Sequence, residues 1–255
     1  GHRRAGIRCA RTPLFRLCAL GPADGKQHRL SAIVSAVRAP KETTSPFRWG
    51  FLALGLVALA IFTGLTLYAA GRPYMPFDVS LERSIQAINW GPLVTVFSWF
   101  DWLEGTRQLY AAGAAIALVA VISWRKAPLM VAGALSGPIY SVVQGIIQRP
   151  RPSADLVHVI RHTGSYSFPS GHVVFFSWVL VLLVVCLGVG RLPRPLLAVA
   201  WIAAAAVLLV ACIGRIYLGE HWPSDVLGGL ALGLGWTSIA LSVRLLSNPA
   251  LAPKK

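Results

Sequence analysis

Six long segments without a charged side chain follow one another along this chain, and each is predominantly apolar. Their bounds are Trp49–Gly71, Gln108–Trp124, Ala127–Gln148, Val173–Gly190, Pro195–Gly214 and Val226–Val243. A helix needs about 20 apolar residues to cross a bilayer, and all six segments are close to that length. The sequence therefore predicts an all-α protein, built as a bundle of six membrane-spanning helices.

The composition of the 255 residues is typical of such a protein, with 55% hydrophobic and only 13% charged residues. Soluble domains carry roughly 25% charged residues, so this composition excludes a disordered chain and disfavours an ordinary soluble domain. The four cysteines form no CxxC pair, and Cys186 and Cys212 lie inside apolar segments. We expect these two to be small buried hydrophobic side chains rather than disulfide partners or metal ligands.

A seventh uncharged segment, Ser84–Phe100, is interrupted by the sequence Asn89–Pro92. A Gly-Pro pair in the middle of a run breaks a helix, because proline lacks the amide donor and clashes with the preceding turn. The segment is therefore predicted to form two short helices at the membrane interface, between the first two spans. Trp90, Trp99 and Trp102 would then be aromatic residues of the interfacial belt.

The net charge of +15 is distributed as in a membrane protein, and it does not indicate a nucleic-acid partner. With six spans, 17 of the 24 Lys and Arg residues lie on the side of the termini and seven on the other. The positive-inside rule then places both termini in the cytoplasm. We expect residues 1–48 to be a basic, disordered cytoplasmic tail, residues 49–246 the membrane domain, and residues 247–255 a short cytoplasmic tail. The oligomeric state leaves no signature in this pattern.

Three stretches on the opposite side concentrate reactive side chains, and the first is Gln144–Pro152. Arg149 and Arg151 each precede a proline, which favours an extended backbone. Their guanidinium groups suit phosphate oxygens, although arginines at an interface also meet lipid headgroups.

The second stretch, Pro169–His172, precedes an apolar run, and Ser170 is placed to cap the helix that begins there. Gly171 permits close backbone approach, and the free amides of a helix start attract anions. His172 would lie in that anion site. The alternative interpretation is a helix cap with an interfacial histidine.

The third stretch contains Arg215, His221 and Asp225. Asp225 follows His221 by four residues, so its carboxylate is within reach of the imidazole and leaves one ring nitrogen free as nucleophile or base. A structural His–Asp capping contact is the alternative. Together the three stretches predict a phosphate site, whereas a metal site is disfavoured because the arginines would repel a cation.

In these motifs the chain resembles the type 2 phosphatidic acid phosphatase (PAP2) superfamily, which includes membrane lipid phosphate phosphatases and soluble haloperoxidases. The resemblance rests on Arg151-Pro152, on Pro-Ser-Gly-His at 169–172, and on Arg215, His221 and Asp225 in order. It implies that His221 attacks phosphorus to form a phosphohistidine, that Asp225 orients it, and that His172 protonates the leaving oxygen and then activates water. It also implies phosphate binding by Arg151, Arg215, Ser170 and Gly171, and it implies no metal or organic cofactor.

Two positions depart from the family pattern: Gln144 replaces a lysine and Gly214 replaces a serine. Glutamine can donate a hydrogen bond to phosphate but carries no charge, and glycine removes a hydroxyl donor. Each such donor is worth roughly 3–4 kcal/mol in a transition state, so catalysis would be weaker unless Arg149 or Arg161 supplies the missing charge.

The resemblance implies an integral membrane phosphatase that hydrolyses a lipid phosphate or diphosphate, such as undecaprenyl diphosphate or phosphatidic acid. Its site would lie on the extracytoplasmic face of the plasma (inner) membrane. Two alternatives stay open on the same fold. One is a non-catalytic lipid-phosphate binder or transporter, and the other is a phosphotransferase that passes the phosphoryl group to an alcohol.

Overall fold

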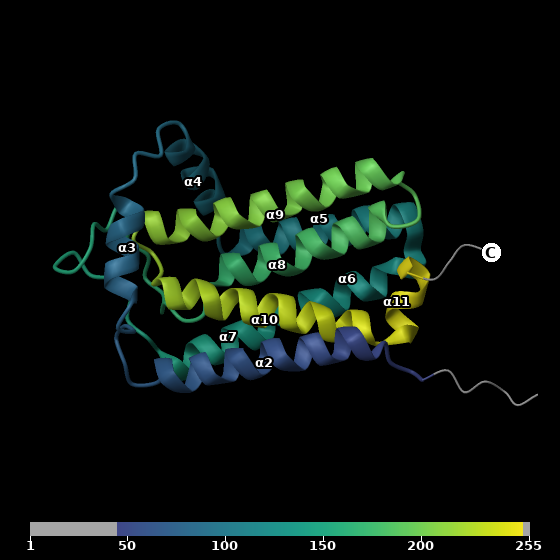
Figure 1. The fold of residues 1–255 in the computed structure, drawn as a ribbon, viewed down its shortest axis with the longest axis horizontal. Helices are drawn as coiled ribbons and strands as arrows, with labels where there is room; N and C mark the ends of the chain where they lie inside the picture. The colour runs from purple at the N-terminus through teal and green to yellow at the C-terminus, as the bar shows by residue number, and fades with distance from the viewer. Residues whose placement is uncertain (1–44, 252–255) are drawn as a thin grey trace, which may run out of the picture. The chain divides into compact units, whose positions relative to one another are not determined.

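The computed structural model of the protein describes residues 45–251, and every regular element in that range is a helix (Figure 1). In chain order the elements are α2 (Trp49–Ala69), α3 (Asp78–Gln86), α4 (Leu93–Trp102), α5 (Thr106–Ser123), the 3-10 turn η1 (Trp124–Lys126), α6 (Ala127–Ala134), α7 (Ser136–Ile147), α8 (Gly171–Leu183), the π-helical turn η2 (Val184–Gly188), α9 (Arg194–Tyr217), α10 (Pro223–Ser242) and α11 (Arg244–Leu251). The all-α prediction is confirmed.

Five helical stretches of the described chain are long and apolar enough to cross a bilayer, which makes this a multi-pass membrane protein. They are Trp49–Ala69, Thr106–Ile147, Gly171–Gly188, Arg194–Tyr217 and Pro223–Ser242. The second stretch has 42 residues, about twice what one span needs. It reverses direction at η1, so that α6 returns alongside α5 (Figure 1). This stretch is therefore a helical hairpin rather than one continuous rod.

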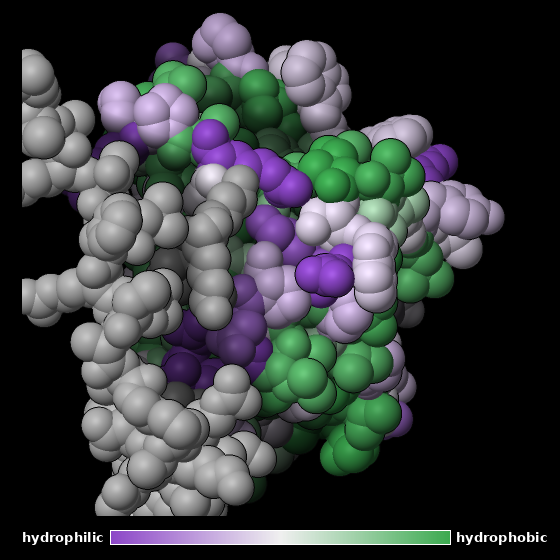
Figure 2. Space-filling view, turned by 90° about the vertical axis from the view of Figure 1, so that its right-hand side faces the viewer, coloured by the Kyte–Doolittle hydropathy of each residue, from purple (hydrophilic) through white to green (hydrophobic). Residues whose placement is uncertain are grey.

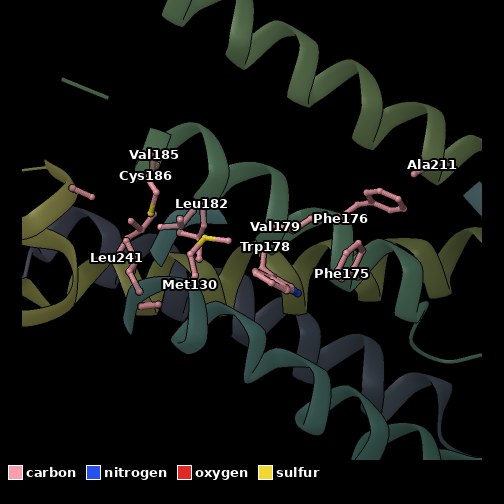
Figure 3. Close-up of a cluster of buried hydrophobic side chains, with 14 residues drawn as sticks. Met130, Phe175, Phe176, Trp178, Val179, Leu182, Val185, Cys186, Ala211 and Leu241 are labelled. Atoms are coloured by element: carbon pink, nitrogen blue, oxygen red, sulfur yellow. The ribbon is translucent and has the colours of Figure 1, made fainter. Parts of the chain in front are cut away.

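The core of the bundle is built around α8. In the stretch Gly171–Gly188, 72% of the residues are buried. Large side chains of α8 pack there against α6, α9 and α10 (Figure 3). Members of this cluster include Met130, Phe175, Phe176, Trp178, Val179, Leu182, Ala211 and Leu241. Cys186 and Cys212 are free and buried, as predicted, whereas the other two cysteines lie outside the described residues. The dense packing fixes α8 and hence the residues of its first turn.

Two helix boundaries differ from the expectation in a way that matters for chemistry. Helix α9 continues to Tyr217, three residues beyond the expected end at Gly214, because the charged Arg215 is paired with carboxylates inside the protein and need not leave the helix. Helix α8 begins at Gly171, two residues before the expected start. As a result, His172 and Arg215 both lie within helices rather than in loops.

The predicted break at Asn89–Pro92 is confirmed, since α3 and α4 flank it as two short helices. Trp90 is partly buried: its indole donates a hydrogen bond to the Ile85 carbonyl at 2.9 Å, and its ring packs edge-on against Phe97. The structure thus places Trp90 in the packing between the two helices. Trp99 and Trp102 are exposed, as aromatic residues at a membrane interface are.

At the end of the bundle opposite α3, the connections between helices contain basic residues. Figure 2 looks at this end, where hydrophilic and apolar side chains alternate on the surface. Arg125 and Lys126 belong to η1, while Arg191 and Arg194 lie between η2 and the start of α9. Residues 1–44, which include nearly all of the expected basic tail, lie outside the described range, so that expectation stays a prediction.

Candidate active site

A cavity of about 660 Å³ lies at the end of the bundle where α8 and α10 begin. Side chains of His172, His221, Arg151 and Glu220 line it. An apolar wall continues from these polar groups, and its residues include Leu109 of α5, Pro138 of α7, and Val174, Phe175 and Trp178 of α8. Two histidines and an arginine from three separate stretches therefore share one cavity, which also offers apolar surface.

His172 is the second residue of α8 and is 6% exposed. Ser170 precedes the helix with an extended backbone but makes no side-chain cap, and its amide instead donates to the Asp225 carbonyl at 3.1 Å. A Cβ atom on Gly171 would lie 2.7 Å from the Tyr140 ring, so glycine is required for this close approach. Within the described residues Nε2 of His172 has no hydrogen-bond partner, which leaves it available to a ligand in the cavity.

The ring of His221 is oriented by a backbone carbonyl. Its Nδ1 lies 2.7 Å from the Ser167 oxygen, whereas Oδ2 of Asp225 is 3.9 Å away. The expected direct contact with Asp225 is thus replaced by the Ser167 carbonyl. Because a carbonyl only accepts, the proton must be on Nδ1 and the Nε2 lone pair is unprotonated. Burial, reinforced by Arg151 and Arg215, lowers the pKa of His221 well below its usual value, so the ring is neutral at pH 7.

Arg151 lies beside the unprotonated nitrogen of His221, whose Nε2 accepts from Nη1 of the arginine at 3.4 Å. Its guanidinium is held by Ser165, through the carbonyl at 2.8 Å and the hydroxyl at 2.7 Å, and by the Glu220 carbonyl at 2.6 Å. These acceptors are neutral, so Arg151 keeps its positive charge for an anion in the cavity.

Arg149 belongs to a buried ion-pair cluster that does not line the cavity. Its Nη1 donates to Asp225 at 2.5 Å and its Nη2 to Asp78 of α3 at 2.9 Å. Asp78 also accepts the Ser224 amide at 2.8 Å, and Asp225 accepts the Trp222 amide at 2.8 Å. Arg149 was expected to contact phosphate. Its donors are instead bonded to Asp78 and Asp225, so it holds Asp225 and the start of α10 in place.

Gln144 is not among the residues that line the cavity either. Its Nε2 donates to the Tyr166 carbonyl at 2.8 Å, and its Oε1 accepts from the Tyr140 hydroxyl at 3.1 Å. The amide therefore ties α7 to the loop before α8 and is not placed for the expected phosphate contact. Arg161 does not replace the missing lysine either, since its guanidinium is ion-paired with Asp101.

Residues of α4 contact both Gly214 and Arg215. A Cβ atom at Gly214 would lie 3.0 Å from the Phe97 ring, so the space of the family's serine side chain is filled by Phe97. Arg215 is fully buried, and its Nη1 donates to Glu220 at 2.7 Å and to Asp101 at 3.1 Å. The arginine is thus adjacent to the cavity through Glu220 but does not line it.

Four residues of this arrangement escaped the sequence interpretation: Asp78, Asp101, Ser167 and Glu220. The signal that could have indicated the three acids is that seven of the nine acidic residues fall on this side of the expected spans. Ionisable residues so close to apolar segments are costly unless paired or functional. Between residues 45 and 251 no three His, Cys, Asp or Glu side chains are grouped as metal ligands.

Comparisons with known proteins identify the family of the chain. Residues 125–248 match the PAP2 superfamily. The chain is 30% identical over 168 residues to phosphatidylglycerophosphatase B of Bacillus subtilis, over 61% of this chain and 80% of that protein. It is 27% identical over 214 residues to lipid A 1-phosphatase of Rhizobium etli, over 78% of this chain and 85% of that protein.

The fold is similar to a crystal structure of a transmembrane PAP2-type phosphatidylglycerolphosphate phosphatase from Bacillus subtilis. The TM-score is 0.62 at 23% identity, covering 73% of this chain and 93% of that one. The structural likeness shows a shared fold, and the sequence relationships show the family. The chain therefore belongs to the PAP2 superfamily and is one of its membrane lipid phosphatases.

Proposed function

We propose that the protein hydrolyses a lipid phosphate or diphosphate, such as undecaprenyl diphosphate or phosphatidic acid, through a phosphohistidine on His221. The observation that supports this most is the single cavity that joins His221, His172 and Arg151 to an apolar wall. A phosphate group needs cationic and hydrogen-bonding partners, and a lipid chain needs an apolar surface. Both requirements are met by neighbouring walls of one cavity.

In the first step, Nε2 of His221 attacks phosphorus. The Nε2–P bond forms while the P–O bond to the lipid breaks, and His172, which enters this step as the imidazolium, gives its Nε2 proton to the leaving oxygen and becomes neutral. Arg151 is placed to hold the non-bridging oxygens, since its Nη1 lies 3.4 Å from the attacking nitrogen. The amides of the first turn of α8, which begins at Gly171, add partial positive charge to the same region, whereas the Ser170 amide is used by the Asp225 carbonyl.

In the second step, a water molecule attacks the phosphorus of the phosphohistidine. His172 takes a proton from this water, the Nε2–P bond breaks, and inorganic phosphate is released. Among residues 45–251 the buried Nε2 of His172 has no hydrogen-bond partner, so it is available to give the proton in the first step and to take one in the second. Asp225 accepts a hydrogen bond from the Trp222 amide, which positions the residue next to His221. Its negative charge, 3.9 Å from Nδ1, stabilises the positive charge that develops on the imidazole.

Six membrane passes follow if the hairpin Thr106–Ile147 is counted as two. The basic connections at 125–126 and 191–194 would then lie with the termini in the cytoplasm. The cavity lies at the other end of the helices, so we place it on the extracytoplasmic face of the plasma membrane. A substrate headgroup at that surface would reach the histidines while its chain stays in the bilayer.

The test is phosphate release by the purified protein in detergent, over a panel of isoprenoid and glycerol lipid phosphates. We expect His221→Ala to abolish release and His172→Ala to lower the rate by about 10²–10⁴-fold, the usual contribution of general acid–base catalysis. His162→Ala is the matched control, because His162 is exposed on the same side and outside the cavity. Full activity of His221→Ala would refute the proposal.

Two further outcomes separate the alternatives. Substrate binding without turnover in the unmodified protein would establish the non-catalytic binder, which the departures at Gln144 and Gly214 favour. Transfer of the phosphoryl group to an added alcohol in preference to water would establish the phosphotransferase. An acid-labile, base-stable phosphoryl-enzyme that disappears in His221→Ala is the result expected for the phosphohistidine intermediate.

A further inference from the structure

Gln86, the last residue of α3, makes three hydrogen bonds with the backbone of two other segments. Its Nε2 donates to the His158 carbonyl at 2.7 Å and to the Tyr217 carbonyl at 3.1 Å, and its Oε1 accepts from the His158 amide at 3.0 Å. His158 belongs to the α7–α8 loop (residues 148–170), whereas Tyr217 is the last residue of α9. One side-chain amide thus joins that loop to the end of α9.

The same two segments carry the groups that surround the ring of His221. The α7–α8 loop supplies Arg151 and the Ser167 carbonyl, and His221 follows the end of α9 by four residues. The Nδ1 atom lies 2.7 Å from the Ser167 oxygen, and Nε2 lies 3.4 Å from Arg151. Both distances depend on how the loop sits against α9, so a contact that fixes these two segments also fixes the nucleophile.

The two backbones touch each other at the point where Gln86 binds them. The Leu218 carbonyl accepts the Ile160 amide at 3.0 Å. A Cβ atom on Gly219, whose φ is +72°, would lie 2.7 Å from the His158 carbonyl oxygen. Gln86 binds this same carbonyl and also the last carbonyl of α9, so its amide holds both sides of the contact.

A primary amide fits these three partners because it carries one acceptor and two donors in one plane. The carbonyl oxygens of His158 and Tyr217 need donors, and the His158 amide needs an acceptor. A carboxylate at position 86 would place a negative oxygen against two carbonyl oxygens. An alkyl or thioether side chain would leave all three backbone groups without this partner.

Helix α3 is itself anchored at its other end. Its first residue, Asp78, pairs with Arg149 at 2.9 Å and accepts the Ser224 amide at 2.8 Å. Figure 1 shows α3 lying across the ends of α9 and α10. Gln86 therefore holds the loop from a helix that is fixed to the start of α10.

We infer that Gln86 is a positioning residue for the chemistry of His221: its amide holds the α7–α8 loop against the end of α9 and so keeps Nε2 of His221 aligned with phosphorus. The inference rests on the proposed function and adds a residue that does not line the cavity. Gln86 also lies before residues 125–248, the range that matches the family. The support for the nucleophile thus comes from a part of the chain outside the matched range.

The test compares two anions in the detergent-solubilised full chain. Orthovanadate adopts the five-coordinate geometry of phosphoryl transfer when a nucleophilic nitrogen bonds to vanadium, so its affinity depends on the alignment of His221. Sulfate is tetrahedral and requires only the cation and amide donors of the cavity. Both dissociation constants are obtained from the rise of the unfolding temperature with anion concentration, which requires no turnover.

In Gln86→Met, which has a similar length and no amide, we expect the vanadate dissociation constant to rise by up to about 10²-fold, the cost of misplacing a reacting group by about 1 Å. The sulfate constant should stay near its wild-type value. Gln86→Glu keeps the shape and the acceptor but loses both donors at pH 7, so it should show the same selective loss and tests the inference if Gln86→Met does not fold.

Two further variants calibrate the result. His221→Ala removes the vanadium ligand and should show the largest loss of vanadate affinity. Arg83→Met is the matched control, because Arg83 is an exposed residue of α3 that donates to the Leu156 carbonyl of the same loop at 2.7 Å and, within the described residues, makes no bond to α9. This variant should keep both constants of the wild type.

A structural role alone would weaken the binding of both anions alike. Equal losses for vanadate and sulfate in the Gln86 variants, or wild-type vanadate affinity in both of them, would overturn the inference. If lipid phosphate is hydrolysed in that case, the proposed function stands without it. Conversely, a selective loss of vanadate affinity in a protein without turnover would support the inference and refute hydrolysis.

Discussion

Replacing Glu82 with glutamine should stabilise the protein, and the gain should grow with pH. Glu82 lies in α3, is fully buried, and neither carboxyl oxygen has a hydrogen-bond partner in the described chain. Burial, with repulsion by Asp78 and Asp225, raises the pKa of Glu82 from 4.5 to about 9. Its contribution to stability is therefore fully present below pH 4.5 and is lost as the pH rises toward 9.

The magnitude follows from this shift. At pH 7 the unfolded chain has released the proton that the folded protein retains, and each pKa unit corresponds to 1.36 kcal/mol. Folding is penalised by about 3 kcal/mol at pH 7 and by less than about 1 kcal/mol at pH 5. Glutamine has the shape of the protonated acid and does not titrate, so Glu82→Gln removes the penalty.

The assay is thermal unfolding in detergent at pH 5 and pH 7, followed by tryptophan fluorescence. For a domain of this size about 1 kcal/mol shifts the midpoint by roughly 2–4 °C, so we expect a gain of roughly 6–12 °C at pH 7 and little at pH 5. Glu104→Gln, at an exposed position, should show no such pH-dependent gain. A midpoint difference between Glu82→Gln and the wild type that is equal at both pH values would refute the reasoning.

Two further predictions concern the residues that α3 and α4 bring to the site. Asp78→Asn leaves Arg149 partly unpaired in a buried cluster, so the unfolding free energy should fall by about 3–5 kcal/mol. The kcat of this variant should also fall more than its KM changes, because Arg149, which holds Asp225, loses one of its two carboxylate partners; an unchanged kcat in folded protein would contradict this. Gly214→Ser should lower the unfolding temperature by crowding Phe97. The double variant with Phe97→Leu should recover the wild-type unfolding temperature. Equal midpoints for the single variant and the wild type would contradict the crowding, because they would mean that the ring moves aside at no cost.

The arrangement of helices was largely predictable from the sequence, because the bilayer imposes a length and forbids unpaired charge. Those two constraints located the apolar segments, and proline and glycine located the break at Asn89–Pro92. They also indicated which loops share one end of the bundle. The three stretches that carry Arg151, His172 and His221 could therefore be predicted to converge.

The partners of the polar residues were not predictable, because they depend on side chains from distant segments. Arg149 and Arg151 occupy equivalent Arg-Pro pairs, yet one is enclosed by Asp78 and Asp225 while the other faces the cavity. The family motif distinguishes the two by falling on Arg151-Pro152, but the physical properties of the two pairs do not, because the difference depends on where α3 packs. Likewise, the glycine at 214 indicated a lost hydroxyl, and only the packing of α4 revealed that an aromatic ring fills the space.

The orientation of His221 by the main chain has a consequence for mutational surveys. Any residue substituted at position 167 still supplies the carbonyl that accepts the imidazole proton, as long as the loop keeps its path. That path is held by the Ser167 amide, which donates to the Arg149 carbonyl at 2.9 Å, and by the Ser167 hydroxyl, which donates to the Pro150 carbonyl at 3.0 Å. A scan that replaces one side chain at a time would report on the buried Ser167 hydroxyl and not on this carbonyl, although the carbonyl is the atom that determines the tautomer of His221.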